Sequence, residues 1–289
     1  MSKHPLEALA CPLANGRRRG ITSVCSAHPL VIEATLRHAF EQGAVALIEA
    51  TCNQVNQEGG YTGMTPVQFR DTVFELAAKV GMPSDRILLG GDHLGPNPWK
   101  ALTAEEAMRR SELMVAAYVE AGFTKIHLDT SMGCRGELTA LPESITSGRA
   151  ARLAAIAEKT SARCGVVPWY VIGTEVPIPG GAHEIIDTLA VTSPEAASRT
   201  YELHREAFKA AGIGDAFARV VGLVVQPGVE FSSENVVEYV PERAANLSAV
   251  LKSLPGLVFE AHSTDYQPAE SLSIVWCRTA SPFSRSGRH

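Results

Sequence analysis

Six of the seven apolar segments that we expect to form strands end in a polar or ionisable residue. These terminal residues are Glu49, Asp92-His93, Asp129, Glu175, Gln226 and His262, with Asp265 just beyond the last of them. One such residue is an ordinary loop group. A convergent ring of them is costly to desolvate unless a cation or a polar ligand occupies its centre. The pattern therefore predicts a polar site where the strands end.

Two imidazoles and a carboxylate in this ring form a metal-ligand set. His93, His262 and Glu175 together suit zinc, with manganese or a similar divalent ion as the alternative. Gln226 either adds an oxygen ligand or hydrogen-bonds a bound sugar. Asp92 directly precedes His93, so a turn at the strand end has to bring both side chains inward, where Asp92 is expected to exchange a proton with a substrate hydroxyl. Such a pair supports aldol cleavage or sugar epimerisation.

Other polar residues inside the apolar segments are interpreted as structural. His127 shares a strand face with Asp129, and we expect it to pack in the core. Glu49 and Glu260 are expected to be interior residues that pair with arginine or lysine. Lys125 begins its strand at the end away from the predicted site, which argues against a Schiff-base aldolase.

Short apolar runs alternate with longer helical patterns along the chain. The predicted strands cover residues 21–27, 45–51, 87–93, 125–131, 167–175, 220–228 and 257–265. Helix start signals precede two of the helical patterns, namely Thr103 with Glu106 three residues later, and Ser193 followed by Pro194. Strands separated by helices imply parallel pairing with right-handed crossovers.

This alternation predicts an α/β fold, specifically a TIM (β/α)8-type barrel whose active site lies at the C-terminal ends of the strands. A doubly wound open sheet is the alternative, but it would need a glycine-rich phosphate loop after the first strand, and residues 26–34 contain none. The polar, glycine-rich loop 54–64 is either a substrate lid or a plain surface loop.

Composition excludes several classes of function. The 289 residues carry a net charge of −5, which gives no basic surface for nucleic acid. No apolar run is long enough to span a bilayer, and the N-terminus lacks the apolar core of a secretory signal. The six cysteines contain no C-x-x-C pair, and no phosphate-loop kinase motif is present. We therefore expect a cytoplasmic protein with neither nucleic-acid nor membrane partners.

Five motifs in order, GGDHLGPNPW, HLDTSMGC, GTEVPIPGG, VVQPGVEF and FEAHSTDYQ, resemble the non-catalytic subunit of class II D-tagatose-1,6-bisphosphate aldolase. This family is also labelled tagatose-6-phosphate kinase. The resemblance covers roughly residues 1–272 and implies a class II aldolase-like barrel. It also implies a stabilising role beside a catalytic aldolase subunit in galactitol or N-acetylgalactosamine breakdown. Because some relatives are associated with metal-dependent 4-epimerisation, the alternative is a fructose/tagatose 4-epimerase or aldolase acting on its own.

The resemblance to catalytic class II aldolases also implies roles for single residues. Asp92 and Asp129 are the implied catalytic residues, and His93, Glu175 and His262 the implied metal ligands. The implied contacts to a sugar or sugar phosphate are Ser131, Gly181, Gln226, Gly228, Ser263 and Asp265. Gln226 stands where the aldolases have a metal-binding histidine. A neutral amide is a weak ligand, so this departure predicts reduced metal affinity or a changed activity.

The segment 273–289 has no helical or alternating pattern, although a barrel needs another helix and an eighth strand here. One choice of codons for residues 273–287, read two bases later, encodes a helix end, a turn and an apolar strand. We therefore expect one barrel domain over residues 1–272, truncated before strand 8, followed by a frameshifted tail over 273–289.

Overall fold

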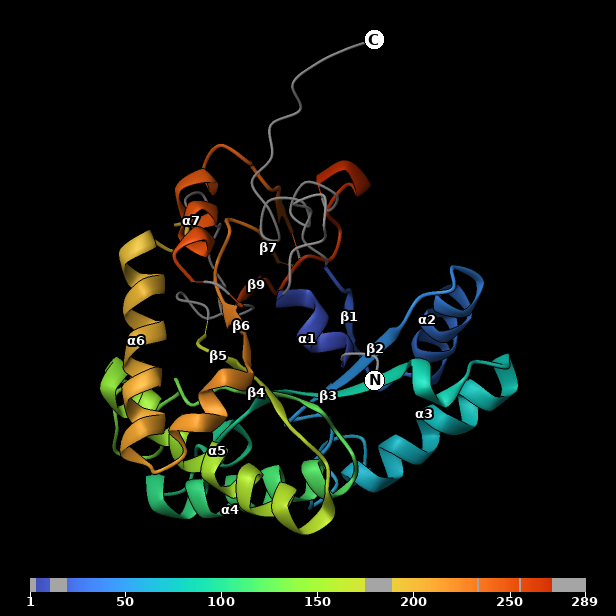
Figure 1. Cartoon of the computed structure of the whole chain (residues 1–289), viewed down its shortest axis with the longest axis horizontal. Helices are drawn as coiled ribbons and strands as arrows, with labels where there is room; N and C mark the ends of the chain where they lie inside the picture. The colour runs from blue at the N-terminus through green and yellow to red at the C-terminus, as the bar shows by residue number, and fades with distance from the viewer. Residues whose placement is uncertain (1–3, 11–19, 175–188, 233, 255, 272–289) are drawn as a thin grey trace. The chain divides into compact units, whose positions relative to one another are not determined.

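Figure 1 shows a computed structural model of the chain, which describes residues 4–10, 20–174, 189–232, 234–254 and 256–271. The chain divides into two compact units. The larger unit comprises residues 21–172 and 203–219, and the smaller unit comprises 1–20, 173–202 and 220–289. The relative positions of the chain's parts are not determined, so each unit is described by itself.

The larger unit is built on five parallel strands that pair in chain order. They are β1 (Ser23–Cys25), β2 (Ala46–Thr51), β3 (Ile87–Leu94), β4 (Lys125–Leu128) and β5 (Trp169–Ile172). Aliphatic side chains on these strands are buried, as Ile48 and Ile126 illustrate. Each strand is followed by a helical crossover, which is why neighbouring strands run in the same direction.

Helices of the larger unit lie along the outer side of its sheet in Figure 1. They are α2 (Pro29–Glu41), α3 (Pro66–Val80), α4 (Ala104–Glu120) and α5 (Glu143–Cys164), with 3₁₀ turns at Ser84–Arg86, Asn97–Trp99 and Gly214–Arg219. Helix α4 begins after the capping box predicted for Thr103 and Glu106. A second capping box, formed by Thr65 and Gln68, begins α3.

The smaller unit contains a second set of parallel strands. Strand β6 (Val220–Val224) pairs with β9 (Val258–Glu260). A hairpin that the sequence pattern did not predict, β7 (Glu230–Phe231) with β8 (Val236–Val237), follows β6. The remaining helical segments are α1 (Pro5–Ala10), α7 (Ala245–Ala249), the 3₁₀ turn Val250–Lys252 and the first part of α6 (Pro194–Ala210). Ser193 caps α6 as predicted, because its Oγ accepts a hydrogen bond from Ala196 N at 3.1 Å.

All seven predicted strands are present among the described residues, and each pairs in parallel with a neighbour of its own unit. Most end earlier than the apolar pattern suggested, so 129–131, 225–228 and 261–265 follow the strands instead of belonging to them. The predicted tail over 273–289 lies outside the described residues, and a single domain over 1–272 stays a prediction. Within the described ranges, no helix has the length and apolar character needed to cross a membrane.

A buried ion pair crosses the sheet of the larger unit. Glu49 on β2, Gly90 on β3 and Lys125 on β4 occupy one row of the strand register. Lys125 Nζ lies 2.8 Å from Glu49 Oε1, with both side chains at most 4% exposed. A Cβ atom on Gly90 would lie 2.0 Å from Glu49 Oε1. The glycine therefore leaves the space through which Glu49 reaches Lys125, and the lysine pairing predicted for Glu49 is confirmed.

Candidate functional site

Strand β3 ends in a backbone irregularity that turns two successive side chains to one side. The register between β3 and β4 shifts between Gly91 and Leu94, and His93 has a φ of +48°. A non-glycine residue in this left-handed region is uncommon and costs conformational energy. In a regular strand Asp92 and His93 would point to opposite faces. Here Asp92 reaches His127 on β4 and His93 reaches Asp129 just after β4, as the turn predicted at this strand end requires.

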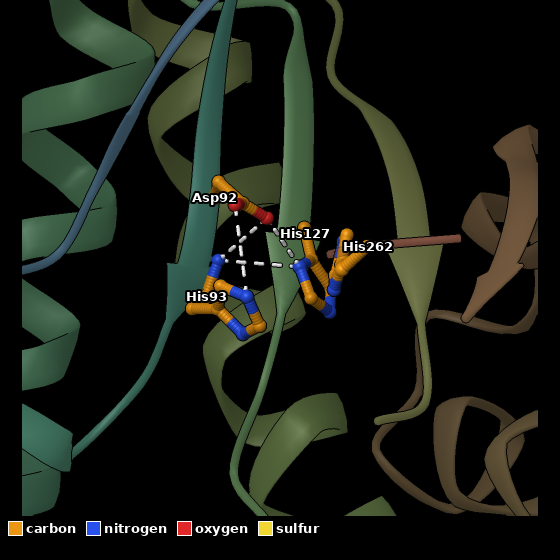
Figure 2. Close-up of side chains that lie close together, drawn as sticks. All are labelled: Asp92, His93, His127 and His262. Carbon is orange, nitrogen blue, oxygen red and sulfur yellow. Dashed lines mark hydrogen bonds and ion pairs between the residues drawn. The ribbon is translucent and has the colours of Figure 1, made fainter. Parts of the chain in front are cut away.

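Four side chains of the larger unit form two hydrogen-bonded pairs. Asp92 Oδ1 lies 2.7 Å from His127 Nδ1, and His93 Nδ1 lies 3.0 Å from Asp129 Oδ2. The His93 backbone N–H also donates to Asp92 Oδ1 at 3.0 Å. Figure 2 shows Asp92 and the rings of His93 and His127 facing one another between the two strands. The predicted residues Asp92, His93 and Asp129 are therefore brought together.

His127 is more than the packing residue that the strand pattern indicated. Its side chain is fully buried, as expected, but it is bonded to Asp92 and its ring centroid lies 4.9 Å from that of His93. The signal that placed it here was its two-residue spacing from Asp129, which puts both side chains on one face. Only the bulge at His93 reveals that Asp92 turns toward that face.

Asp129 is held as a carboxylate by its neighbours. Burial alone would raise its pKa, but the hydrogen bond from His93, the charges of both imidazoles and the bond from Ser131 together hold the pKa well below its usual value. Ser131 Oγ donates to Asp129 Oδ1 at 2.7 Å, so the two carboxylate oxygens have different partners. An ionised Asp129 that accepts a hydrogen bond from the Nδ1–H of a neutral His93 leaves the lone pair of the ring on Nε2.

The donor atoms of this cluster fit a divalent metal ion. Asp92, His93 and His127 each offer one ligand atom, and these atoms lie within 4.8 Å of one another. Imidazole nitrogen and carboxylate oxygen are ligands that zinc and similar ions accept. His93 Nε2 and Asp92 Oδ2 are 3.7 Å apart, which is too long for a direct hydrogen bond. The carboxylate–histidine pairing through Asp129 is the arrangement that commonly orients a metal-binding histidine.

Two of the predicted site residues, Glu175 and Gly181, lie outside the described residues. His262, the third predicted metal ligand, belongs to the smaller unit. Its Nε2 lies 3.1 Å from Oε1 of Glu260, and the pairing of Glu260 with arginine or lysine stays a prediction. The convergence of His262 with His93 stays a prediction. So does the substrate contact assigned to Ser263, which has a φ of +52°, and to the exposed Asp265.

The side chain of Gln226 is fixed by its own loop in the smaller unit. Its Oε1 accepts hydrogen bonds from Gly228 N at 2.8 Å and from Val229 N at 2.9 Å. Gly228 has a φ of +95°, a conformation that favours glycine. Gln226 is fully buried, and its Nε2 has no hydrogen-bond partner among the described residues. Because the oxygen is already committed to two backbone donors, the amide nitrogen is the group left for a ligand.

Comparisons with known proteins agree with the predicted fold and family. The model of the D-tagatose-1,6-bisphosphate aldolase subunit GatZ/KbaZ-like family matches residues 6–276. A protein of Agrobacterium fabrum named D-tagatose 6-phosphate 4-epimerase is 55% identical over 271 residues, which are 93% of this chain and 64% of that protein. The chain thus spans about two thirds of the length of this curated relative.

Similar solved structures agree with this family and fold. A Sinorhizobium meliloti structure, described as a probable tagatose 6 phosphate kinase, has 57% sequence identity and a TM-score of 0.81, covering 89% of this chain and 62% of that one. A Coccidioides immitis structure, provisionally assigned as a fructose-1,6-biphosphate aldolase, is 18% identical with a TM-score of 0.52, covering 91% of this chain and 74% of that one. The second likeness shows the fold alone, which is the α/β barrel type of these aldolases. The match over residues 6–276 shows that the chain belongs to the GatZ/KbaZ-like family of D-tagatose-1,6-bisphosphate aldolase subunits.

Proposed function

We propose that this chain catalyses the metal-assisted 4-epimerisation of a ketohexose, with D-tagatose 6-phosphate as the expected substrate. The observation that carries the proposal is the strained end of β3, where the turn at His93 places Asp92 against His127 and His93 against Asp129. Backbone strain of this kind concentrates at functional sites. The relative named D-tagatose 6-phosphate 4-epimerase supports the choice of substrate.

In this proposal His93, Glu175 and His262 would hold the metal ion. A bound divalent ion supplies a Lewis acid that polarises the ketose carbonyl. Asp129 keeps the Nδ1 proton of His93 in place and so fixes the orientation of the ring.

Asp92 is the proposed proton carrier. Its Oδ1 lies 2.7 Å from His127 Nδ1 and accepts from the His93 N–H, so the carboxylate is held beside the proposed metal ligand His93. The Asp92 carboxylate accepts the proton of the C4 hydroxyl as the C3–C4 bond breaks, which leaves an aldehyde at C4 and passes the electron pair of the broken bond to the C2 carbonyl as an enolate. It returns the proton after the resulting aldehyde has rotated and the bond has closed on its other face. The same carboxylate therefore serves as base and then as acid, and no proton is gained or lost overall.

Gln226 is proposed to bind the substrate and not the metal. Its Oε1 is used by the backbone of 228–229, while its buried Nε2 can donate to a hydroxyl or phosphate oxygen. A buried donor without a partner costs about 1–3 kcal/mol, and a ligand oxygen would recover this energy. Ser131, Gly181, Gly228, Ser263 and Asp265 remain proposed neighbours of the sugar.

The test is metal analysis of the purified chain followed by an epimerase assay on D-tagatose 6-phosphate and D-fructose 6-phosphate. We expect a stoichiometric divalent ion and interconversion of the two sugars. His93→Ala should abolish both, whereas His38→Ala, which changes an exposed histidine on α2, should leave both intact. Interconversion that survives in His93→Ala would refute the proposal.

A second candidate is a stabilising subunit for a catalytic class II tagatose-bisphosphate aldolase in galactitol or N-acetylgalactosamine breakdown. The family description favours it, because it names an aldolase subunit. This candidate predicts no conversion by the chain alone. It also predicts that the chain co-purifies with the catalytic subunit and raises the melting temperature of that subunit.

A further inference from the structure

A hollow of about 630 Å³, lined by both polar and apolar atoms, lies in the larger unit between the loop that follows β2 and the loop that follows β3. Asn53, Glu58 and Tyr61 line it from the first loop, and Trp99 lines it from the second. The volume lies within the range of small-molecule sites. None of these residues belongs to the cluster of Asp92 and His93, and the proposed reaction assigns no role to any of them.

The wall formed by the loop after β2 is fixed in place. Asn56 is 4% exposed; its Nδ2 donates to Cys52 O, and its Oδ1 accepts from Glu58 N and Gly60 N. Gly60 has a φ of +57°, and a Cβ there would lie 2.4 Å from Gln54 O. The loop therefore packs too closely to admit a side chain at this position. Of the two interpretations of loop 54–64, a substrate lid or a plain surface loop, this packing favours a surface loop that does not move. Such a preformed wall loses little entropy when a ligand binds.

The chemistry of the hollow combines an aromatic face with a fixed carboxylate. The Tyr61 side chain is an exposed aromatic, at 73% of its possible area. Trp99 Nε1 donates to Glu58 Oε2 at 3.2 Å, and Arg110 donates to Glu58 Oε1 at 2.9 Å, so the carboxylate is held from two sides. Carboxylate oxygens have room for further hydrogen bonds beyond these two donors. An aromatic ring beside a fixed acceptor suits a molecule with an apolar C–H face and several hydroxyl groups.

The same lining argues against an anion. Among the residues that line the hollow, all of which are described, there is no lysine, arginine or histidine, whereas Glu58 contributes a carboxylate. Arg110 is engaged with that carboxylate, which reduces its attraction for a further anion. A phosphate group would meet a negative charge without a cationic partner of its own.

We propose that this hollow binds a neutral polyhydroxylated molecule, a sugar or the unphosphorylated part of one, with its C–H face on Tyr61 and its hydroxyls on Glu58 and Asn53. The proposal stands without the epimerase assignment, because it uses a different set of residues. The hollow is then a second carbohydrate site, at the same ends of β2 and β3 from which the candidate catalytic site is built.

Trp99 provides a signal for the test, because its indole lines the hollow and donates to Glu58. The full chain is titrated with D-tagatose and D-fructose while tryptophan emission is recorded, and binding is confirmed by calorimetry. We expect a saturable change in emission that disappears in Trp99→Phe. Tyr61→Ala should weaken binding about tenfold, equivalent to ~1.4 kcal/mol, and Glu58→Gln should weaken it as well.

Matched variants separate this site from the candidate catalytic site. Phe40→Ala removes an exposed aromatic side chain on α2 and should leave the affinity unchanged. His93→Ala should also leave this binding intact, even if it abolishes epimerisation. Calorimetric binding that is unchanged in both Tyr61→Ala and Glu58→Gln would overturn the proposal. Displacement of the sugar by inorganic phosphate would overturn it too.

Discussion

Asp129 Oδ2 lies 3.0 Å from His93 Nδ1, and this contact joins the end of β4 to the end of β3. Ser131 occupies the other oxygen of the same carboxylate. Because the pKa of Asp129 is low, Asp129 is a carboxylate in this contact and accepts the hydrogen bond from the His93 N–H. The orientation of the His93 ring, and with it the nitrogen offered to a metal, therefore depends on a residue that need not touch the substrate.

Asp129→Asn should lower metal affinity roughly 10- to 100-fold, because the amide cannot provide the charge that fixes the His93 tautomer. The affinity is measured by competition with a chelator of known strength. Asp71→Asn, which changes a half-exposed aspartate on α3, is the control and should bind metal like the unmodified chain. Ser131→Ala should have a smaller effect, since it leaves the bond to His93 in place. Equal metal affinity in Asp129→Asn and the unmodified chain would show that the contact only supports the fold.

Lys125→Met should lower the free energy of unfolding by about 3–5 kcal/mol, because it leaves the Glu49 carboxylate buried without its cation. The double variant Glu49→Leu/Lys125→Met should recover most of this loss, because the uncompensated charge is gone. Urea unfolding of the two variants and the unmodified chain gives the three values. A double variant as unstable as Lys125→Met would mean that the cost comes from packing and not from the charge.

The repeating parts of the fold could be predicted from the sequence. Strands such as β2 and β3 are apolar because both of their faces are buried, and the helix cap at Thr103 depends on residues only three apart. The position of Asp92 and His93 followed from the same pattern, since parallel strands bring their C-terminal ends to one edge. The lysine that pairs with Glu49 was also foreseeable, because a buried carboxylate needs a cation.

The features that could not be predicted depend on local backbone conformation, which leaves no periodic pattern in the sequence. Asp92 contacts His127 because the strand has a bulge at His93, and the alternation of polar and apolar residues does not predict this bulge. Strands β7 and β8 contain two residues each, too few for a recognisable pattern. The commitment of the Gln226 oxygen to backbone donors arises from the loop at Gly228, whose left-handed conformation is visible only in three dimensions.

Acidification should weaken the link between α4 and α5. The hydrogen bond from Arg152, followed by the charge of Arg152 and the contact with Arg109, lowers the pKa of Glu105 to about 2. A carboxyl whose pKa is lowered by folding stabilises the protein above its unfolded value, near 4.5, and the effect disappears as the pH falls toward 2. The difference in melting temperature between the unmodified chain and Glu105→Gln should therefore shrink as the pH falls from 6 to 3. In an Arg152→Met background the Glu105→Gln change should show no such trend, and a trend that persists there would exclude this ion pair as its source.

Gln226→Glu should separate the two chemical groups of the amide. The substituted side chain keeps an oxygen that can accept from Gly228 N and Val229 N, but at neutral pH it loses the Nε2 donor. We expect cooperative unfolding to persist while affinity for D-tagatose 6-phosphate falls about tenfold or more, because a carboxylate repels the oxygen that the amide binds. Gln226→Leu removes the acceptor as well, so the backbone N–H groups of Gly228 and Val229 lose their partner. This change should lower the free energy of unfolding by about 1–3 kcal/mol. Calorimetry with the sugar phosphate and urea unfolding give the two readouts. Unchanged sugar affinity in Gln226→Glu would show that Gln226 does not bind the substrate. If the variant lost metal affinity as well as sugar affinity, Gln226 would instead be a metal ligand.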